Sequence, residues 1–187
     1  NISAAQKTPD LVIQNKPEKS AGVISAEGEL TGEMIYEKVS PSVVGIVVYS
    51  SETTATKSGE GSGIILSSDG YIVTNEHVVD GAKLIEVVLS NEERYTAKLI
   101  GYDMQTDLAV VKIDAQNLVA AQLGNSDELK PGEKVYAIGN PGGMEFANSI
   151  TDGIVGGVNR LLTNSSTGYV MTCIQTNAAI NPGNSGG

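Results

Sequence analysis

The last residues of the sequence have the composition of a turn that presents a nucleophile. Residues 181–187 read Asn-Pro-Gly-Asn-Ser-Gly-Gly, and Ser185 carries the only hydroxyl among them. Neighbouring glycines permit tight backbone angles, which can expose a serine oxygen and direct backbone N–H groups to one point. The same residue types form ordinary surface turns and frayed termini, so this segment alone supports both interpretations.

His77, the only histidine of the chain, is the candidate general base. It follows an expected strand at residues 71–74, and loops at strand ends often carry chemistry. The alternative is a structural histidine, which is the commoner role of a lone one. With one histidine and one cysteine, Cys173, the chain lacks the paired ligands of a zinc hydrolase. A metal-dependent hydrolase that uses scattered carboxylates is a remote alternative with no supporting motif; we expect no metal, no cofactor and no intrachain disulfide.

Asp107 is the candidate partner of the histidine. It immediately precedes the apolar residues 108–113, so we expect a partly buried carboxylate that needs a donor such as an imidazole N–H. A turn that begins a strand is the alternative interpretation. Asp80 is nearer to His77 but lies in an expected solvent-facing turn. The order His77, Asp107, Ser185 is that of the chymotrypsin-like hydrolases and differs from that of the α/β-hydrolases and the subtilisins.

The elements that must position these residues are short strands rich in Val and Ile and separated by turn residues. They are expected at residues 43–49, 63–66, 71–74, 84–89, 95–102, 108–113, 134–138, 145–150, 153–158 and 169–176. This pattern predicts an all-β antiparallel sandwich or barrel, with an internal boundary near residues 125–132.

Three further segments have an expected role. Residues 33–39 are expected to form a short helix that packs on the core through Met34, Ile35 and Val39, and Pro41 should end it. Alternating glycines at 59, 61 and 63 precede a strand and no helix, so we interpret them as part of a hairpin and not as a nucleotide site. Residues 1–32 are expected to be a flexible arm or linker.

The charge balance excludes some partners. The chain has 12 basic and 22 acidic residues, a net charge of −10, and no basic cluster that could follow a phosphate backbone. Nucleic acid and anionic membrane surfaces are therefore poor partners. No apolar run approaches the ~20 residues of a membrane span.

Several blocks of the sequence resemble, in the same order, the signature segments of the HtrA/Deg family of trypsin-like serine proteases. They are residues 74–79, 106–110, 123–126 with 130–132, 137–141, 153–155 and 178–187. The resemblance implies two six-stranded antiparallel β-barrels of the chymotrypsin type. Residues 33–128 would form the first barrel, with His77 and Asp107. Residues 129–187 would form part of the second, with Ser185, and that barrel would be incomplete in this chain.

The resemblance also implies roles for single residues. His77, Asp107 and Ser185 would form a catalytic triad, and the backbone N–H groups of Gly183 and Ser185 would form the oxyanion hole. Ile180 would wall the specificity pocket and favour a small aliphatic side chain before the cleaved bond. Residues 161–169 resemble the regulatory loop of the family. Asn177 stands where many relatives have Asp, and the sequence does not give the effect of this change.

The function implied is a serine endopeptidase that degrades unfolded or damaged proteins in the bacterial cell envelope, without a cofactor and as a homotrimer. Contact with a membrane would require an N-terminal anchor outside this chain. The alternative is a chaperone-like protease-fold domain that binds exposed peptide segments without cutting them. Because the sequence stops two residues after Ser185, we expect a fragment of a longer protease.

Overall fold

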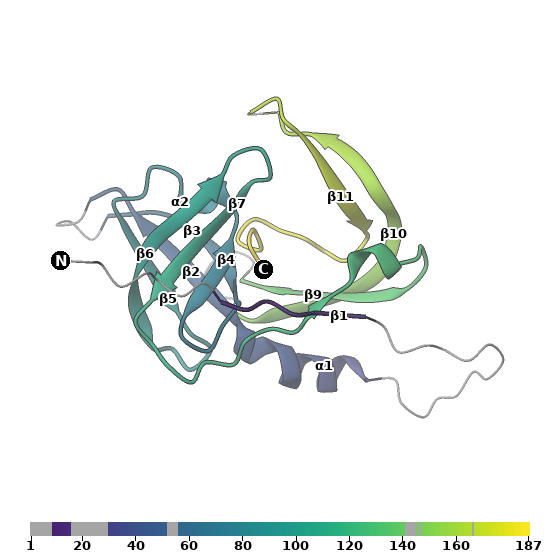
Figure 1. Cartoon of the computed structure of the whole chain (residues 1–187), viewed down its shortest axis with the longest axis horizontal. Helices are drawn as coiled ribbons and strands as arrows, with labels where there is room; N and C mark the ends of the chain where they lie inside the picture. Colours follow the sequence, from purple (N-terminus) through teal and green to yellow (C-terminus); the bar gives the residue numbers. More distant parts are fainter. Residues whose placement is uncertain (1–8, 16–29, 52–55, 141–144, 146, 166) are drawn as a thin grey trace.

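The first half of the molecule is a closed antiparallel barrel of six strands. The computed structural model describes residues 9–15, 30–51, 56–140, 145, 147–165 and 167–187. The strands are β2 (Val43–Tyr49), β3 (Lys57–Ile65), β4 (Tyr71–Thr74), β5 (Leu84–Val88), β6 (Arg94–Asp103) and β7 (Leu108–Ile113). They close in the order β2-β3-β4-β7-β6-β5 (Figure 1). The all-β prediction is confirmed, and the expected strands are present, although β3 begins at Lys57 instead of Gly63.

The barrel closes around branched aliphatic side chains. In β7, alternate residues Ala109, Val111 and Ile113 are at most 1% exposed, which is the period of two expected of a strand with one face inward. Ile46 of β2, across the barrel, and Ile72 of the neighbouring strand β4 are fully buried in the same cluster. This packed interior provides a rigid support for the loops at the barrel end.

A second antiparallel sheet follows, with strand order β11-β10-β9 (Figure 1). Its strands are β9 (Lys134–Gly139), β10 (Ser149–Thr163) and β11 (Val170–Thr176). Within the described residues this sheet has three strands and does not close, in keeping with the expectation of an incomplete second barrel.

The prediction of two strands at residues 145–150 and 153–158 is wrong, because one strand, β10, includes the last two residues of the first range and all of the second. Asp152 and Gly153, which have the composition of a turn, pair with Tyr136 and Val135 of β9. After Ile154 the strand changes partner from β9 to β11, and the pairing with β11 has register shifts on both sides of Gly157. Residue types that are typical of turns can therefore lie inside a long strand, where they lead to a false prediction of a loop.

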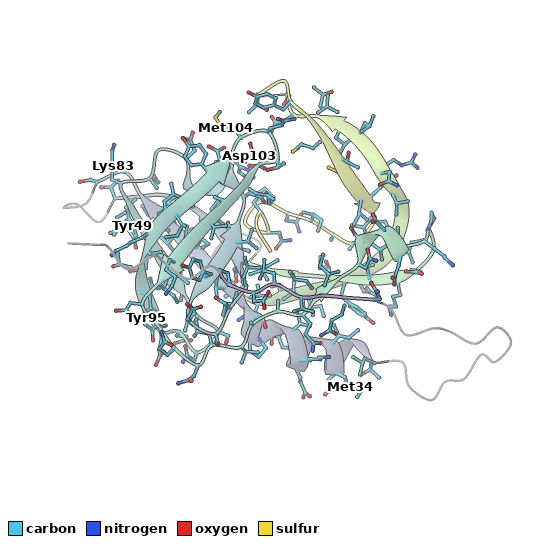
Figure 2. The ribbon with its side chains drawn as sticks, in the orientation of Figure 1. Met34, Tyr49, Lys83, Tyr95, Asp103 and Met104 are labelled. Atoms are coloured by element: carbon cyan, nitrogen blue, oxygen red, sulfur yellow. The ribbon has the colours of Figure 1, made fainter. Side chains whose placement is uncertain are left out.

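The expected helix is present as α1 (Gly32–Val39), with a 3₁₀ turn η1 (Ser40–Ser42) after it. The Thr31 hydroxyl caps it by accepting the Met34 N–H at 3.2 Å. The expected core packing is wrong, because no residue of α1 is buried and Met34 is 49% exposed (Figure 2). The helix lies at the periphery, where a Cβ added at Gly32 would lie 2.9 Å from the Tyr136 ring.

Part of the N-terminal segment pairs with the rest of the chain. Strand β1 (Ile13–Gln14) runs parallel to β8 (Leu123–Gly124), which precedes the 3₁₀ turn η2 (Ser126–Glu128). The remainder of the expected arm, residues 1–8 and 16–29, lies outside the described residues. Among the helices that the structure describes, none has the length and apolar character needed to cross a membrane.

Candidate active site

Two of the three candidate residues meet at one end of the first barrel. His77 lies in the short helix α2 (Glu76–Val79), and Asp107 is the last residue before β7. His77 Nδ1 is 2.8 Å from Asp107 Oδ2 and 3.0 Å from Oδ1. The side chain of Asp107 is 14% exposed and that of His77 is 55% exposed. The pair therefore joins a largely buried carboxylate to an imidazole that a substrate could reach.

The backbone around Asp107 holds its carboxylate in place. Asp107 has a φ of 54°, in the left-handed region that residues with side chains seldom adopt. Its carbonyl oxygen accepts the Glu76 N–H at 3.1 Å and Asn75 Nδ2–H at 2.8 Å. Its Oδ1 also accepts the backbone N–H of His77 at 3.0 Å. Asp107 is thus fixed to α2 independently of the imidazole.

The turn that leads into Asp107 is closed by Asp103, at the end of β6 (Figure 2). The Asp103 carboxylate accepts the Thr106 hydroxyl at 2.9 Å and the Gln105 N–H at 3.0 Å. These two hydrogen bonds favour the charged carboxylate and lower the pKa of Asp103 below its ordinary value. At neutral pH the turn is therefore stabilised by an ionised acceptor.

The Asp107 contact determines the tautomer of His77. An ionised carboxylate only accepts hydrogen bonds, so we assign the proton of the neutral ring to Nδ1. Nε2 then carries the free lone pair, on the opposite side of the ring. This is the arrangement that a general base requires.

The segment that carries Ser185 docks against the same region of the barrel. The Ser62 N–H of β3 donates to the Ser185 carbonyl at 2.7 Å. A Cβ at Gly61 would overlap the Val78 side chain and lie 3.1 Å from the Ser185 carbonyl oxygen. Because Val78 is the residue after His77, this contact places the backbone of Ser185 beside α2. A glycine at 61 is needed for that approach.

Gly186 forms the other close contact of this segment. Its φ is +89°, and an added Cβ would collide with Ser62 O and Thr74 Oγ1. The Thr74 hydroxyl donates to the same Ser62 carbonyl at 2.7 Å, where both residues are 1% exposed or less. Glycine at 186 therefore serves both the turn and the approach to the barrel wall.

The backbone N–H groups of Gly183 and Ser185 have no hydrogen-bond acceptor among the residues that the structure describes. Gly183 has a φ of +100°. No hydrogen bond joins the Ser185 hydroxyl to His77 among the residues that the structure describes. Such catalytic bonds are often long in ligand-free enzymes and tighten when substrate binds.

The residues before the Ser185 turn are tied to β10. Asn177 Oδ1 accepts the Ile154 N–H at 2.8 Å, and the Thr151 hydroxyl donates to the Ala179 carbonyl at 2.9 Å. The amide of Asn177 thus provides the acceptor that an Asp carboxylate would also provide, which the sequence alone does not reveal. Ile180, the expected pocket wall, follows directly and is 59% exposed.

The segment expected to be a regulatory loop, residues 161–169, is partly strand. β10 continues to Thr163, and β11 begins at Val170. The turn between them is closed by hydrogen bonds from Asn164 N–H to Tyr169 O and from Gly168 N–H to Asn164 O, both at 2.8 Å. Residue 166 lies outside the described residues. The loop is therefore confined to the tip of a hairpin.

One buried carboxyl lies beside the His77–Asp107 pair. Glu76 is 9% exposed. Burial raises the pKa of Glu76 above its ordinary value, and the nearby carboxylates of Asp80 and Asp107 raise it further, while His77 opposes them. Asp80 itself is exposed, as expected.

The sequence did not identify two residues beside the Ser185 segment: Ser62, which binds the Ser185 carbonyl, and Asn140, whose backbone N–H donates to the Ser62 hydroxyl at 3.0 Å. The glycines at 59, 61 and 63 do lie in a hairpin, but within β3 and not at its turn, which falls at residues 67–70. Ser62 stands between two of them, and glycines inside a strand indicate a close backbone approach. That signal could have identified Ser62. No sequence signal singles out Asn140 except that it lies in residues 137–141, a block that resembles the HtrA/Deg proteases.

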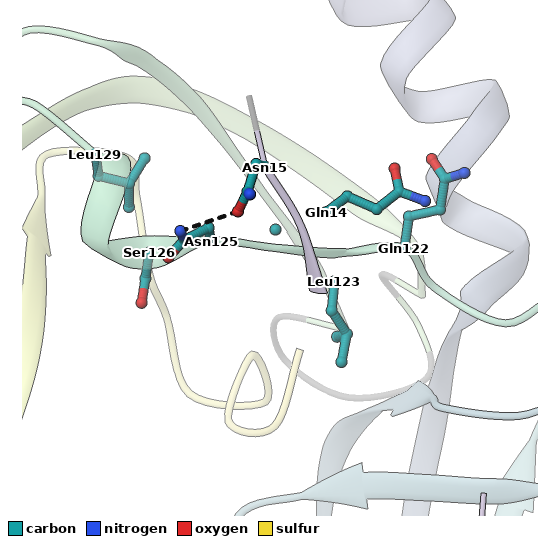
Figure 3. Close-up of a pocket in the computed structure, with 8 residues that line it drawn as sticks. Gln14, Asn15, Gln122, Leu123, Asn125, Ser126 and Leu129 are labelled. Atoms are coloured by element: carbon teal, nitrogen blue, oxygen red, sulfur yellow. Dashed lines mark hydrogen bonds between the residues drawn. The ribbon is translucent and has the colours of Figure 1, made fainter. Parts of the chain in front are cut away.

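A pocket of about 420 Å³ lies apart from these residues, where β1 pairs with β8. Figure 3 shows the polar side chains of Gln14, Asn15, Gln122 and Asn125 around it. Asn125 Nδ2 donates to Asn15 Oδ1 at 3.1 Å, the bond that is dashed in the figure. None of the candidate catalytic residues lines this pocket.

Comparison with known proteins agrees with the fold and with the sequence blocks. Residues 61–187 match the trypsin-like peptidase domain family. The chain therefore belongs to the trypsin-like peptidases. Within that family its similarity is to the HtrA/Deg proteases, as the following relatives and solved structures indicate.

A probable periplasmic serine endoprotease DegP-like from Pseudomonas savastanoi pv. phaseolicola is 45% identical over 100% of this chain and 37% of its own length. The serine protease Do-like HtrB of Bacillus subtilis is 45% identical over 81% of this chain and 37% of its own length. The chain thus spans little more than a third of these relatives.

Two solved structures are similar to this one. The HtrA-type protease AlgW with tripeptide has a TM-score of 0.70 and 40% identity, and the match covers 81% of this chain and 47% of that chain. The serine endoprotease from Yersinia pestis has a TM-score of 0.69 and 34% identity, over 86% of this chain and 53% of that chain.

Proposed function

We propose that the chain is the catalytic part of a serine endopeptidase with the triad His77, Asp107 and Ser185. The observation that carries this proposal is the bonded pair of His77 Nδ1 and Asp107, 2.8 Å apart, beside which the Ser185 carbonyl is bound to β3 at 2.7 Å. Three residue types that can transfer a proton and attack a carbonyl therefore gather at one end of the first barrel.

In this proposal Ser185 Oγ attacks the carbonyl carbon of the scissile peptide bond while its proton moves to His77 Nε2. Asp107 stabilises the imidazolium that forms. The carbonyl oxygen becomes an oxyanion bound by the N–H groups of Gly183 and Ser185. As the carbon–nitrogen bond breaks, His77 returns the proton to the leaving amine and an acyl-enzyme remains. Water then repeats the sequence and releases the acid with Ser185 restored.

Ile180 is the proposed specificity residue. It is exposed, it follows the Thr151 to Ala179 hydrogen bond, and it lies five residues before the nucleophile. A branched aliphatic wall at that place would favour a small aliphatic side chain before the cleaved bond.

We further propose unfolded or damaged polypeptides as substrates, a homotrimeric assembly and an extracytoplasmic location in the bacterial cell envelope. The support is the family and the relatives, since DegP-like proteins of Marinomonas and Pseudomonas are named periplasmic serine endoproteases.

One observation favours the alternative of a chaperone-like domain. Apolar side chains are exposed along the β10–β11 hairpin, a surface suited to apolar peptide segments. They are Leu161 (72%), Leu162 (54%), Tyr169 (44%) and Val170 (55%).

Cleavage of casein distinguishes the two functions. The Ser185→Ala variant of the protein at its natural length should lose cleavage, with Ser51→Ala as a control that removes a serine far along the chain. Retained cleavage in Ser185→Ala would reject the triad. Suppression of aggregation that persists in Ser185→Ala, together with no cleavage by the unmodified protein, would support the chaperone-like domain.

A further inference from the structure

We propose that Ser62 is a positioning residue for the oxyanion hole: its hydroxyl holds the carbonyl of Gly183 and so orients the N–H groups on either side of that peptide. The inference rests on the proposed function, because it assigns a supporting residue to the same site. Ser62 lies on β3 of the first barrel, 123 residues before Ser185 in the sequence.

The hydrogen bonds of the Ser62 hydroxyl use its full capacity. Its Oγ donates to the Gly183 carbonyl at 2.8 Å. It accepts the Asn140 backbone N–H at 3.0 Å and Asn140 Nδ2–H at 3.1 Å. A hydroxyl has one proton and two lone pairs, so both acceptor positions are occupied by Asn140 and the proton is left for Gly183.

The direction of this network is fixed from its other end. The Asn148 N–H donates to Asn140 Oδ1 at 2.9 Å, which determines which side of the Asn140 amide is oxygen. Nδ2 of Asn140 is thereby directed to the Val44 carbonyl, at 2.9 Å, and to Ser62. In each of these hydrogen bonds the donor and the acceptor are therefore fixed, from the Asn148 N–H through Asn140 and Ser62 to the Gly183 carbonyl.

The network is also shielded from water. Ser62 is 0% exposed and Asn140 is 1% exposed. Hydrogen bonds in such an environment are stronger than those at a surface, and an unpaired group there is costly. Loss of the Gly183 carbonyl would therefore leave the proton of the buried Ser62 hydroxyl unpaired, which favours the Ser62–Gly183 hydrogen bond.

Gly183 needs such a restraint. It has no Cβ and a φ of +100°, so its own sterics restrict its backbone less than those of any other residue would. Its carbonyl belongs to the peptide between Gly183 and Asn184, which lies between the two proposed oxyanion donors. A rotation of that peptide would redirect the N–H groups of Gly183 and Ser185 relative to each other.

The network gives the second sheet a role in the chemistry. Val44 and Ser62 belong to β2 and β3 of the first barrel, while Asn140 follows β9 of the second sheet. A displacement of β9 would thus reach Gly183 through Asn140 and Ser62.

The test is Ser62→Ala, made in the protein at its natural length. Its matched control is Ser58→Ala, which removes another β3 hydroxyl that donates to a backbone carbonyl, that of Val48 at 3.1 Å. The readouts are kcat and KM on a peptide substrate, the melting temperature, and the downfield Nδ1–H proton signal of His77, assigned by its loss in His77→Gln. We expect Ser62→Ala to lower kcat about tenfold to a hundredfold, less than the ~10²–10³ for removal of one oxyanion donor, while KM changes less than about twofold and the His77 signal persists.

If Ser62→Ala has the same kcat as Ser58→Ala, the proposal is wrong. It is also wrong if the activity lost in Ser62→Ala is fully explained by the fraction of that variant that is unfolded. If Ser62→Ala does not fold, Ser62→Cys decides, because a thiol is a weaker donor of similar size: a reduced kcat at unchanged KM supports the proposal, and an unchanged kcat rejects it. Cleavage that survives Ser185→Ala rejects the proposed function itself, whereas an inactive Ser185→Ala with a fully active Ser62→Ala rejects only the role of Ser62.

Discussion

At the scale of single residues, both carboxylate oxygens of Asp107 contact the His77 ring, but only Oδ1 also accepts the His77 backbone N–H. Oδ1 accepts the His77 backbone N–H at 3.0 Å and also lies 3.0 Å from Nδ1, whereas Oδ2 contacts Nδ1 alone of these two groups and is the nearer oxygen, at 2.8 Å. One side chain thus fixes both the position of the helix residue and the tautomer of its ring. The two roles can be separated by changing one oxygen.

Asp107→Asn should preserve the fold and abolish most of the activity. If the amide oxygen stays on the His77 N–H, its NH₂ group faces Nδ1 and forces the ring proton to Nε2, which then cannot accept a proton from Ser185. We expect kcat to fall by roughly 10⁴-fold, as the same change does in a chymotrypsin-type triad. Measurements of kcat and melting temperature check this, with Asp80→Asn as the control for an exposed acid three residues from His77. Equal activities of the two variants would contradict the assignment.

Glu76 should make the fold less stable as the pH rises. Burial raises the pKa of Glu76, so the folded state binds its proton more tightly than the unfolded state does. Stability then decreases as the pH rises from the unfolded pKa, near 4.5, through the folded value. Glu76→Gln should therefore raise the melting temperature by a few degrees at pH 7, and this gain should shrink towards pH 4.5. Exposed Glu37→Gln is the control; a gain independent of pH would show that Glu76 does not titrate in this way.

At the scale of elements, glycines determine how closely the Ser185 segment approaches β3 and β4. Gly186→Ala adds a Cβ that collides with Ser62 O and Thr74 Oγ1, and it also imposes alanine on a positive φ. Gly132→Ala imposes the same backbone cost, at φ +93°, with no atom within 4 Å of the new Cβ. The difference between the two variants therefore isolates the contact.

We expect Gly186→Ala to reduce kcat/KM at least tenfold more than Gly132→Ala does, with both compared to the unmodified protein. The reason is displacement of Ser185 from its bond with the Ser62 N–H. Peptide cleavage and melting temperature measure the two effects separately. Similar losses in both variants would show that only backbone strain matters at position 186.

The first barrel was predictable from the sequence because its strands are separated by real turns. Tyr71 to Thr74 is bounded by Gly70 and Asn75, and its aromatic and β-branched residues favour a strand. The strand β10 was not predictable as one strand, because Asp152 and Gly153 are residue types typical of a turn, yet both pair with β9. Local composition reports backbone preference, and ladder pairing with a distant strand can override it.

The α1 helix shows the same limit for packing. Its beginning and its end follow from the Thr31 cap and from Pro41, which act locally. Its apolar residues suggested a buried face, yet the barrel interior is already filled by its own strands. Burial depends on what the rest of the fold leaves uncovered, and the sequence of one helix does not contain that information.

At the scale of the whole molecule, the site lies where the first barrel meets the segments of the second sheet. His77, Asp107 and Ser185 could be singled out by residue type and order. The glycines on either side of Ser62 could have indicated a close backbone approach at that residue. Its hydrogen-bond network with Asn140 could not be predicted, because it forms only when β2, β3 and the end of β9 come together. Serine and asparagine have many ordinary roles, and only the contacts distinguish this one.

The most direct test of the triad is the reaction of the protein, at its natural length, with a fluorophosphonate, followed by intact mass and peptide mapping. An activated serine attacks this reagent and an ordinary one does not. We predict one adduct, on Ser185, that is absent in Ser185→Ala and strongly reduced in His77→Ala. An adduct that persists in Ser185→Ala, or no adduct on the unmodified protein, would contradict the assignment of Ser185 as the nucleophile.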